Sequence, residues 1–563
     1  MQRDPHGYWR VTCADLAPGT RYRYRLNGAD EYPDPAARCQ PAGVHGPSAL
    51  VDPQFRWTDD DWVGLPLHDY VIYELHVGTF TAEGTFAAII PQLPQLRELG
   101  VTAIELMPVA HFPGTRNWGY DGVYLYAPHT AYGGVSGLKR LVDACHAHGM
   151  AVILDVVYNH FGPEGNYLWS VARPFFTDRY HTPWGDAINY DGSESGPVRH
   201  FMLANALYWL REFHIDALRL DAVHAIHDGS PRHLLAELAD AAQTQAARLG
   251  RRALLIAEGD DPRLIRPRKH GGYGMDAHWA DHFHHALRVI LTGERLGYMA
   301  AFGQLEHLAR AYRQAHVFTR SNPNAALRPA APHPGPRRPE QFVVCVQNHD
   351  QVGNRPVGDR LSASLSFEQL KLVAGALLLA PFVPLIFMGE EYGETGPFQF
   401  FTDHSDPDLI RGVREGRKAE FAAFVAAHGV DLPDPQDPAT FARAKLDHAL
   451  RNGGRYQVLR SLYRELLRLR RELPALRAVS LDSLVASADE ASHTICLTRR
   501  TADDLVWAGL NFGAQPAALS PPPGRWQTIL DSAAPQWADP VMPTADLPSE
   551  TVAPYSFRLL RIR

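Results

Sequence analysis

Several common sequence signals are missing from this 563-residue chain, and each absence narrows what the protein can be. The five cysteines, Cys13, Cys39, Cys145, Cys345 and Cys496, form no CxxC pair and no metal-ligand spacing, which favours reduced thiols and a cytoplasmic location. The N-terminus lacks an apolar core after a basic start, so we expect no secretory signal. A net charge of −7 leaves no basic surface for nucleic acid.

Long apolar runs are also scarce. The one uncharged run long enough to cross a bilayer extends from Leu372 to Gly389. Pro381 and Pro384 interrupt it, so we predict a buried helix, a turn and a short buried strand. No membrane partner is therefore predicted.

The central part of the chain alternates short apolar runs with amphipathic stretches. The runs are VIYELHVG, AIELMPV, VILDVVY, DALRLDAV, LLIAEG, DAHWA, FVVCVQNHD and PLIFMGEE. Eight strand and helix units predict an α/β fold of the (β/α)8 barrel type, with the chemistry at the carboxyl ends of the strands. A doubly wound sheet would usually carry a glycine-rich phosphate loop after its first strand, and VGTFTAEGTF is not one.

Three domains are expected from the composition. Residues 1–65 are predicted to form a small N-terminal β domain, whose beginning close to a strand at YWRV is compatible with a truncated start. Residues 66–474 form the catalytic barrel, with 159–199 as an irregular, ordered excursion over its mouth. Residues 475–563 form a C-terminal β domain, and the polar, proline-rich stretch 320–339 is expected to be an exposed loop.

Three carboxylates follow apolar strands where the barrel mouth should lie: Asp221, Glu258 and Asp350. Carboxylates in apolar strands are costly unless they are paired or used. Retaining glycoside hydrolysis uses two of them about 5 to 5.5 Å apart, and neighbouring strands about 4.8 Å apart can supply that spacing. The alternative is that these are ordinary strand-end carboxylates that cap the following helices.

Residue spacing assigns different tasks to the three acids. Arg219 and Asp221 are two residues apart on one strand, so both side chains face the same way and the guanidinium favours an ionised nucleophile. Glu258 follows four apolar residues, a setting that favours the protonated form required of an acid. Asp350 remains to hold sugar hydroxyls.

A metal site is the competing chemical interpretation of HWADHFHHALRV, where His278, Asp281, His282, His284 and His285 are crowded together. The segment lacks HExxH, and two adjacent histidines cannot share a helical face. We therefore predict no metal and no other cofactor, and a substrate-facing loop that leads into a helix.

Four short motifs, DVVYNH, ALRLDAVHA, IAEGD and QNHD, resemble those of glycoside hydrolase family 13, the α-amylase family. The resemblance implies a β-sandwich before the barrel and a β domain after it. It also implies a retaining glycosidase with Asp221 as nucleophile, Glu258 as general acid/base and Asp350 as transition-state stabiliser. It also implies that residues around the cleaved sugar bind substrate, namely Tyr120, His160, Arg219 and His349. Asp121, beside Tyr120, is a further candidate.

Longer passages are similar to those members of the family that cut the α-1,4 bond between a glucan chain and a terminal trehalose unit. They include QPAGVHGPSALVD, GYGMDAHWADHFHHAL, QNHDQVGNRPVGDRLS and MGEEYGETGPFQFFTDHSDPDL. This likeness implies malto-oligosyltrehalose as substrate and a role in trehalose biosynthesis. For recognition of trehalose, the aromatic and acidic residues expected near the mouth are Trp184, Trp279, Asp281 and Phe283, and ordinary packing is the alternative.

Departures from the family pattern and rival functions stay open at this stage. Ala225 replaces a histidine common in α-amylases, which leaves His224 as the nearer polar partner of the nucleophile, and a glycine follows Glu258. The rivals are an α-1,4-glucan branching enzyme and a non-catalytic glucan-binding barrel. The likeness also implies a pathway link to the synthase that makes malto-oligosyltrehalose, without implying physical contact.

Overall fold

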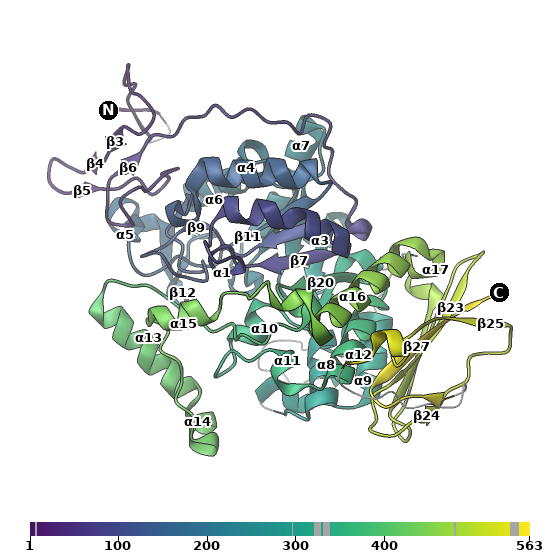
Figure 1. Cartoon of the computed structure of the whole chain (residues 1–563). Coiled ribbons are helices and arrows are strands. Elements are labelled where there is room, and N and C mark those ends of the chain that lie inside the picture. The colour runs from purple at the N-terminus through teal and green to yellow at the C-terminus, as the bar shows by residue number, and fades with distance from the viewer. Residues whose placement is uncertain (6–7, 296, 320–327, 330–337, 478–479, 541–550) are drawn as a thin grey trace.

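A computed structural model describes the whole chain except residues 6–7, 296, 320–327, 330–337, 478–479 and 541–550. Figure 1 shows a central barrel with the N-terminal segment at one side and a β-sheet domain at the opposite end. The division of the chain at residues 65 and 474 stays a prediction. The proline-rich stretch 320–339 falls almost entirely outside the described residues.

All eight predicted apolar runs form strands of one closed parallel barrel. The strands in chain order are β7 (Ile72–Leu75), β8 (Ala103–Leu106), β11 (Ala151–Val156), β14 (Ala217–Leu220), β15 (Leu254–Ala257), β16 (Ala277–Trp279), β19 (Phe342–Cys345) and β20 (Val383–Phe387). Each pairs with the next, and β20 returns to β7 through pairs such as Leu385 with Ile72. The barrel predicted from the sequence is confirmed.

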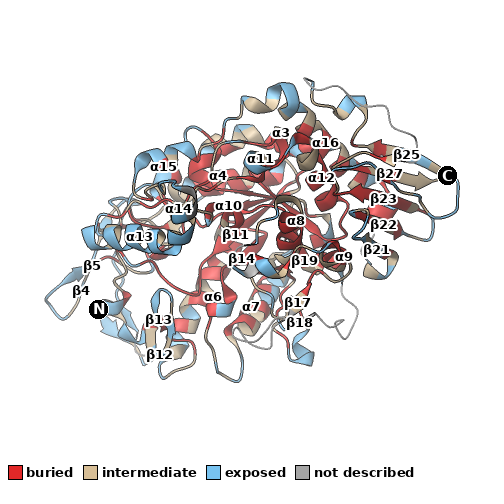
Figure 2. Cartoon of the chain, turned by 90° about the horizontal axis from the view of Figure 1, so that it is seen from below, coloured by how far each residue is buried: buried red, intermediate tan, exposed pale blue. Residues whose placement is uncertain are grey.

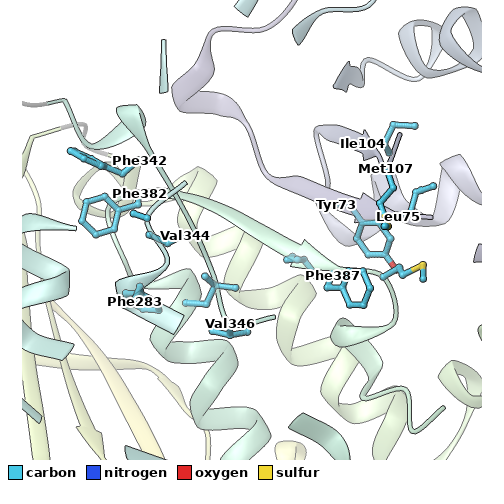
Figure 3. Close-up of a cluster of buried hydrophobic side chains, with 14 of the residues drawn as sticks. Tyr73, Leu75, Ile104, Met107, Phe283, Phe342, Val344, Val346, Phe382 and Phe387 are labelled. Atoms are coloured by element: carbon cyan, nitrogen blue, oxygen red, sulfur yellow. The ribbon is translucent and has the colours of Figure 1, made fainter. Parts of the chain in front are cut away.

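Side chains of the barrel strands alternate between two separate apolar clusters. One cluster fills the barrel interior and includes Ile72, Ala103, Ile153, Ile256 and Val343. The neighbouring positions point outward into the layer beneath the helices, and Figure 3 shows several of them, among them Tyr73, Leu75, Ile104 and Val344. This two-residue period explains how strands that read as continuous apolar runs bury both of their faces.

Helices surround the barrel, and Figure 2 shows their inner faces buried. The long ones are α4 (Gly134–Ala147), α6 (Ser195–Glu212), α7 (Leu234–Leu249), α8 (His282–Thr292), α9 (Leu305–Gln314), α12 (Phe367–Leu378) and α16 (Gly454–Glu472). The shorter α3 (Leu93–Leu99) ends at Gly100, whose φ of 112° is the left-handed conformation that favours glycine at a helix end. Between β15 and β16 the described residues form only the short helix η6 (Arg268–His270), so one unit lacks a full helix.

The excursion after β11 is more regular than expected. It contains α5 (Leu168–Val171) and an antiparallel hairpin of β12 (Phe176–Thr182) and β13 (Gly185–Ile188). Helix α6 then begins at Ser195, inside the stretch predicted to belong to the excursion. The prediction of an irregular segment was wrong because a pleated hairpin, anchored on aromatic residues, satisfies its own backbone groups.

The two flanking regions differ in their regularity. The N-terminal region has three pairs of two-residue strands, β1 (Gln2–Arg3) with β2 (Trp9–Arg10), β3 (Arg21–Tyr22) with β6 (Ser48–Ala49), and β4 (Tyr24–Arg25) with β5 (Glu31–Tyr32). These separate pairs, in the part of the region that is described, do not make the two packed sheets of the predicted sandwich. Strands this short leave too little apolar surface to cover a second sheet.

The C-terminal region is one antiparallel sheet in the order β21 (Leu484–Asp489), β22 (Thr494–Arg500), β23 (Leu505–Asn511), β27 (Ser556–Ile562) and β25 (Trp526–Asp531). It packs on α12 at Gly375, where an added Cβ would lie 2.4 Å from the ring of Phe557. The predicted C-terminal β domain is confirmed as a sheet. The apolar run at Leu372 forms α12, a turn and β20, as expected, and no described helix is long and apolar enough to span a membrane.

Candidate functional site

Asp221 and Glu258 lie side by side at the carboxyl ends of β14 and β15. The two strands pair in parallel with Leu220 opposite Ala257, and each acid is the next residue of its strand. The Glu258 backbone N–H donates to the Leu220 carbonyl at 3.0 Å, which continues the ladder past the strand ends. Adjacent strands lie about 4.8 Å apart, which is close to the separation of about 5 to 5.5 Å that a retaining glycosidase needs between its two carboxyl groups.

One guanidinium joins these two acids. Arg219, only 1% exposed, donates from Nη1 to Asp221 Oδ1 at 2.8 Å and lies with Nη2 2.9 Å from Glu258 Oε2. Its Nη1 also donates to Asp155 Oδ2 at 2.7 Å, and its guanidinium lies 4.2 Å from the ring centre of Trp279. The predicted shared orientation of Arg219 and Asp221 is confirmed.

The surroundings of Glu258 are polar, which corrects the expected apolar setting. Besides Arg219, the backbone N–H of Ala222 donates to Glu258 Oε2 at 2.7 Å. Ala222 adopts φ 40° and ψ 50°, a left-handed conformation that is unfavourable for a residue with a Cβ. This turn directs the Ala222 N–H toward Glu258. The strained backbone conformation of Ala222 therefore lies beside the carboxyl group that it binds.

A second network holds Asp350 and its neighbour His349 in helix α10 (His349–Gly353). His349 Nδ1 contacts Glu74 Oε1 at 2.5 Å, and its Nε2 contacts the Tyr120 hydroxyl at 2.8 Å. Burial opposes the charge of His349, but the Glu74 carboxylate raises the pKa of that imidazole to about 9. Burial also raises the pKa of Asp350. Asn348 caps the helix through Gln351 N, so Asp350 does not serve as the cap.

Tyr120 connects the two networks. Its hydroxyl donates to Asp155 Oδ2 at 2.7 Å, and Arg219 binds the same oxygen. Burial raises the pKa of Asp155 to about 7, against the opposing effect of Arg219. An unbroken chain of contacts thus runs from Glu74 through His349, Tyr120 and Asp155 to Arg219 under the nucleophile.

His160, at the end of β11, lies on the opposite side of Tyr120. Its Nε2 is 3.0 Å from the Tyr120 carbonyl, and burial lowers the pKa of its imidazole to about 4. Trp184, in the turn of the excursion hairpin, stacks on His160 with ring centres 4.1 Å apart and planes 7° apart. Asp121 accepts from Asn117 Nδ2 at 2.6 Å. The excursion therefore reaches the site through Trp184, which is half-exposed.

The remaining candidates for substrate recognition differ in their exposure, and only the exposed ones can contact a sugar. Asp281, at the start of α8, is partly exposed, and burial together with Glu258 and Asp350 raises its pKa to about 7. His224 is exposed one turn after the nucleophile. Phe283 is fully buried against Tyr312, as Figure 3 shows for its position in the core, so its predicted role was wrong.

Trp279 is also corrected. It is 4% exposed and packs inside the barrel beneath Arg219, because it lies within β16 at an inward-facing position. A large ring there supports the guanidinium and does not face an opening. Two histidines of the same crowded segment bind backbone carbonyls, His278 that of Gly259 at 2.6 Å and His284 that of Val346 at 2.7 Å.

Three residues of the site were missed or underestimated from the sequence, namely Asn159, Glu74 and Glu105. Asn159, which follows β11, donates from its side-chain amide to Asp221 Oδ2 at 2.8 Å. Glu74 and Glu105 lie opposite each other on β7 and β8 at inward positions. The signal was available, because each acid interrupts an apolar strand at the parity that points into the barrel.

Comparison with known proteins gives relatives along most of the chain. The family described as alpha amylase, catalytic domain, matches residues 32–184. A malto-oligosyltrehalose trehalohydrolase of Saccharolobus solfataricus is 47% identical over 474 residues, which cover 84% of this chain and 81% of the relative. One of Mycobacterium tuberculosis is 42% identical over 575 residues, which cover 100% and 95%.

More distant comparisons support the barrel. A 1,4-alpha-glucan branching enzyme of Corynebacterium jeikeium is 28% identical over 435 residues, which cover 69% of this chain and 56% of the relative. A crystal structure of a candidate alpha amylase from Salmonella typhimurium superposes with a TM-score of 0.89 at 39% identity, over 100% of this chain and 94% of the other. A pullulanase of Anoxybacillus at 18% identity and a TM-score of 0.71 shares the fold.

Proposed function

The chain belongs to the malto-oligosyltrehalose trehalohydrolase family, and we propose that it hydrolyses the α-1,4 bond between a malto-oligosyl chain and its terminal trehalose. In this proposal Asp221 is the nucleophile, Glu258 the general acid/base and Asp350 the transition-state stabiliser. The observation that carries it is the single Arg219 guanidinium bound to Asp221 and Glu258 on adjacent strands.

The first step cleaves the substrate. Asp221 attacks the anomeric carbon of the glucose unit next to trehalose while Glu258 protonates the departing O4 of trehalose. Arg219 and Asn159 hold the two oxygens of the Asp221 carboxylate in place, at 2.8 Å each. In the second step Glu258 takes a proton from water, which displaces Asp221 and frees the glucan with retained configuration.

Glu258 can deliver its proton from one oxygen only. Its Oε2 is occupied by the Ala222 N–H and by Arg219, so Oε1 is the oxygen left for the leaving group and later for water. Fixed donors on Oε2 remove the rotation that would otherwise exchange the two oxygens. Orientation of this kind lowers the entropic part of the barrier.

Substrate contacts are distributed around these three acids. Asp350 grips the ring hydroxyls of the sugar that is cleaved, and Tyr120 offers that sugar a flat face. His160, His349 and Asp121 lie within reach as hydrogen-bonding groups. On the leaving-group side we retain Trp184 and Asp281, because the first is exposed and the second partly exposed. His224, exposed three residues after the nucleophile, stays a candidate substrate contact.

Two further parts of the proposal rest on the sequence. We propose a cytoplasmic location, since scattered cysteines suit a reducing compartment. We also propose a metabolic link to the enzyme that makes malto-oligosyltrehalose, without a physical complex.

The test is product analysis by chromatography. Purified protein is incubated separately with maltohexaosyltrehalose, maltohexaose and amylose. Free trehalose together with maltohexaose, and little attack on the plain glucans, is the expected result.

A different pattern of products would reassign the protein. New α-1,6 branches in amylose without any trehalose would make it a branching enzyme that uses the same three acids. Binding of glucan without any product would make it a non-catalytic barrel.

A further inference from the structure

Helix α13 (Pro407–Glu420) is an exposed helix beside the catalytic mouth. None of its residues is buried, and Figure 2 shows it mostly exposed. With α14 (Ala422–His428) it extends from the body of the molecule in Figure 1. An exposed helix needs specific contacts to keep a fixed position, since it has no core face of its own.

Arg417 supplies such a contact from the last turn of α13. Its guanidinium lies over two aromatic rings, 5.2 Å from the centre of Phe400 and 4.7 Å from that of Phe421. Glu420 Oε2 accepts from its Nη1 at 3.2 Å. Because the Arg417 guanidinium contacts two rings and a carboxylate, its side chain has few alternative rotamers.

The same guanidinium also contacts the C-terminal end of helix α10, the helix that carries Asp350. Nη2 donates to the carbonyl of Gly353 at 3.3 Å, and Nη1 donates to Asn354 Oδ1 at 3.4 Å. The Asn354 side-chain Nδ2 in turn donates to Asp350 Oδ1. Arg417 and Asp350 are thus joined through one amide, although 67 residues separate them in the sequence.

We propose that Arg417, acting through Asn354, is a positioning residue that orients the Asp350 carboxylate toward the sugar being cleaved. This inference rests on the proposed function of Asp350. Asn354 occupies one carboxylate oxygen and leaves Oδ2 for the sugar hydroxyls.

The need for an outside anchor follows from the local fold. Helix α10 has only five residues, so its own hydrogen bonds fix Asp350 weakly. The Asn354 amide can present its oxygen or its nitrogen to Asp350. Arg417 donates to the amide oxygen and thereby fixes the orientation in which the nitrogen faces the carboxylate.

The test compares Arg417→Met, which keeps the stacking stem and removes the charge, with Asn354→Ala and the double variant. We expect kcat for trehalose release to fall about tenfold in each single variant, with KM changed less than about threefold. The double variant should be no slower than either single variant, because both break one chain of contacts. Arg417→Lys should recover part of the loss.

Arg414→Ala is the matched control. Arg414 also tethers α13, through Asp434 at 2.7 Å, but it does not contact α10. Its kcat should stay within about twofold of the parent value. Circular dichroism and thermal melting of every variant establish that the fold is retained.

A second readout separates positioning from a loss of structure. α-Maltotriosyl fluoride and its counterpart lacking the 2-hydroxyl on the reacting sugar are hydrolysed by parent and variants. Removing the hydroxyl should slow the parent strongly and Arg417→Met clearly less, since the variant already grips that hydroxyl poorly.

Equal penalties in the parent and Arg417→Met, or a kcat for both single variants at the parent value, would overturn the inference. So would a loss in Arg414→Ala as large as that in Arg417→Met. If the parent itself releases no trehalose but hydrolyses the fluoride, the proposed function fails while the fluoride comparison still decides the role of Arg417.

Discussion

Both ends of the barrel bury carboxylates, but the two ends differ in how many hydrogen-bond donors and cations those carboxylates have. At the amino-terminal end, Asp59 accepts hydrogen bonds from His146 Nδ1, His214 Nδ1 and Arg251 Nη1 at 2.8 to 2.9 Å. His146 also contacts Asp216 at 2.9 Å. At the carboxyl-terminal end, several acids share few cations.

The acids of the mouth are Glu74, Glu105, Asp155, Asp221, Glu258, Asp281 and Asp350, and the central cations among the described residues are Arg219 and His349. The imbalance has visible effects. Burial raises the pKa of Asp155 and Asp281 to about 7, whereas hydrogen bonds from His146, His214 and Arg251 outweigh burial and lower the pKa of Asp59. The lesson is that saturated networks stabilise a barrel, while unsaturated ones leave carboxyl groups able to exchange protons.

The comparison is tested most strongly at the nucleophile. Asp221→Asn should fold normally and lose at least about 1,000-fold in kcat, because no carboxylate remains to attack. Trehalose release from maltohexaosyltrehalose measures the loss, and the thermal midpoint checks the fold. Activity above a tenth of the parent value in a clean preparation would remove Asp221 from the proposed role.

At the opposite end a similar change should act on stability and leave the chemistry unchanged. Asp59→Asn leaves three donors without their carboxylate and should destabilise the fold by about 3 to 5 kcal/mol. Urea unfolding of this variant measures the effect, with the neighbouring exposed Asp60→Asn as the control. A midpoint unchanged from the parent would show that the network at Asp59 is dispensable.

Replacing the buried carboxyl group of Glu105 should raise the stability of the fold, the opposite of the effect expected at Asp59. It is 1% exposed, and neither of its carboxyl oxygens has a hydrogen-bond partner among the described residues. Glu105→Leu should therefore stabilise the fold by about 1 to 3 kcal/mol, since an unpaired polar group leaves the interior. Urea unfolding beside Glu105→Gln checks this, and a clear loss of stability in the leucine variant would contradict it.

The pH dependence of His349 gives a smaller effect with a defined sign. Its folded pKa of about 9 lies above the unfolded value of 6.5, so its pairing with Glu74 stabilises the fold fully below pH 6.5. That contribution falls as the pH rises through about 9. The difference in thermal midpoint between the parent and His349→Gln should therefore shrink from pH 6 to pH 10, and a difference that stays constant over this range would contradict the prediction.

The smallest effect is expected at the rim. Trp184→Ala removes the ring stacked on His160 and should raise KM about 2- to 10-fold with little change in kcat. Trp169→Ala is the control, since Trp169 is exposed to a similar extent on the same excursion but stacks on Phe176. Equal KM values for the two variants would remove Trp184 from the substrate path.

Much of the candidate site could be predicted because alternate residues of a strand point to the same face, so the sequence shows which side chains face the same way. Arg219 and Asp221 had to share a face, and the acids that end β14 and β15 had to be neighbours in a barrel. The roles of Trp279 and Phe283 were not predictable, because an aromatic residue near a mouth reads the same in sequence whether it faces substrate or core. The setting of Glu258 was also misread, since its polar partners come from a different strand.

The sequence by itself determined the eight strands, most of the helices between them and the three acids at the strand ends, because apolar periodicity acts over a few residues. Only the tertiary structure decided which charges meet. Arg219 between two acids, Glu74 under His349 and Arg417 beside Asn354 each join segments that are distant in the chain or lie on different strands. Such pairings depend on barrel closure and on the positions of surface helices, which no local pattern encodes.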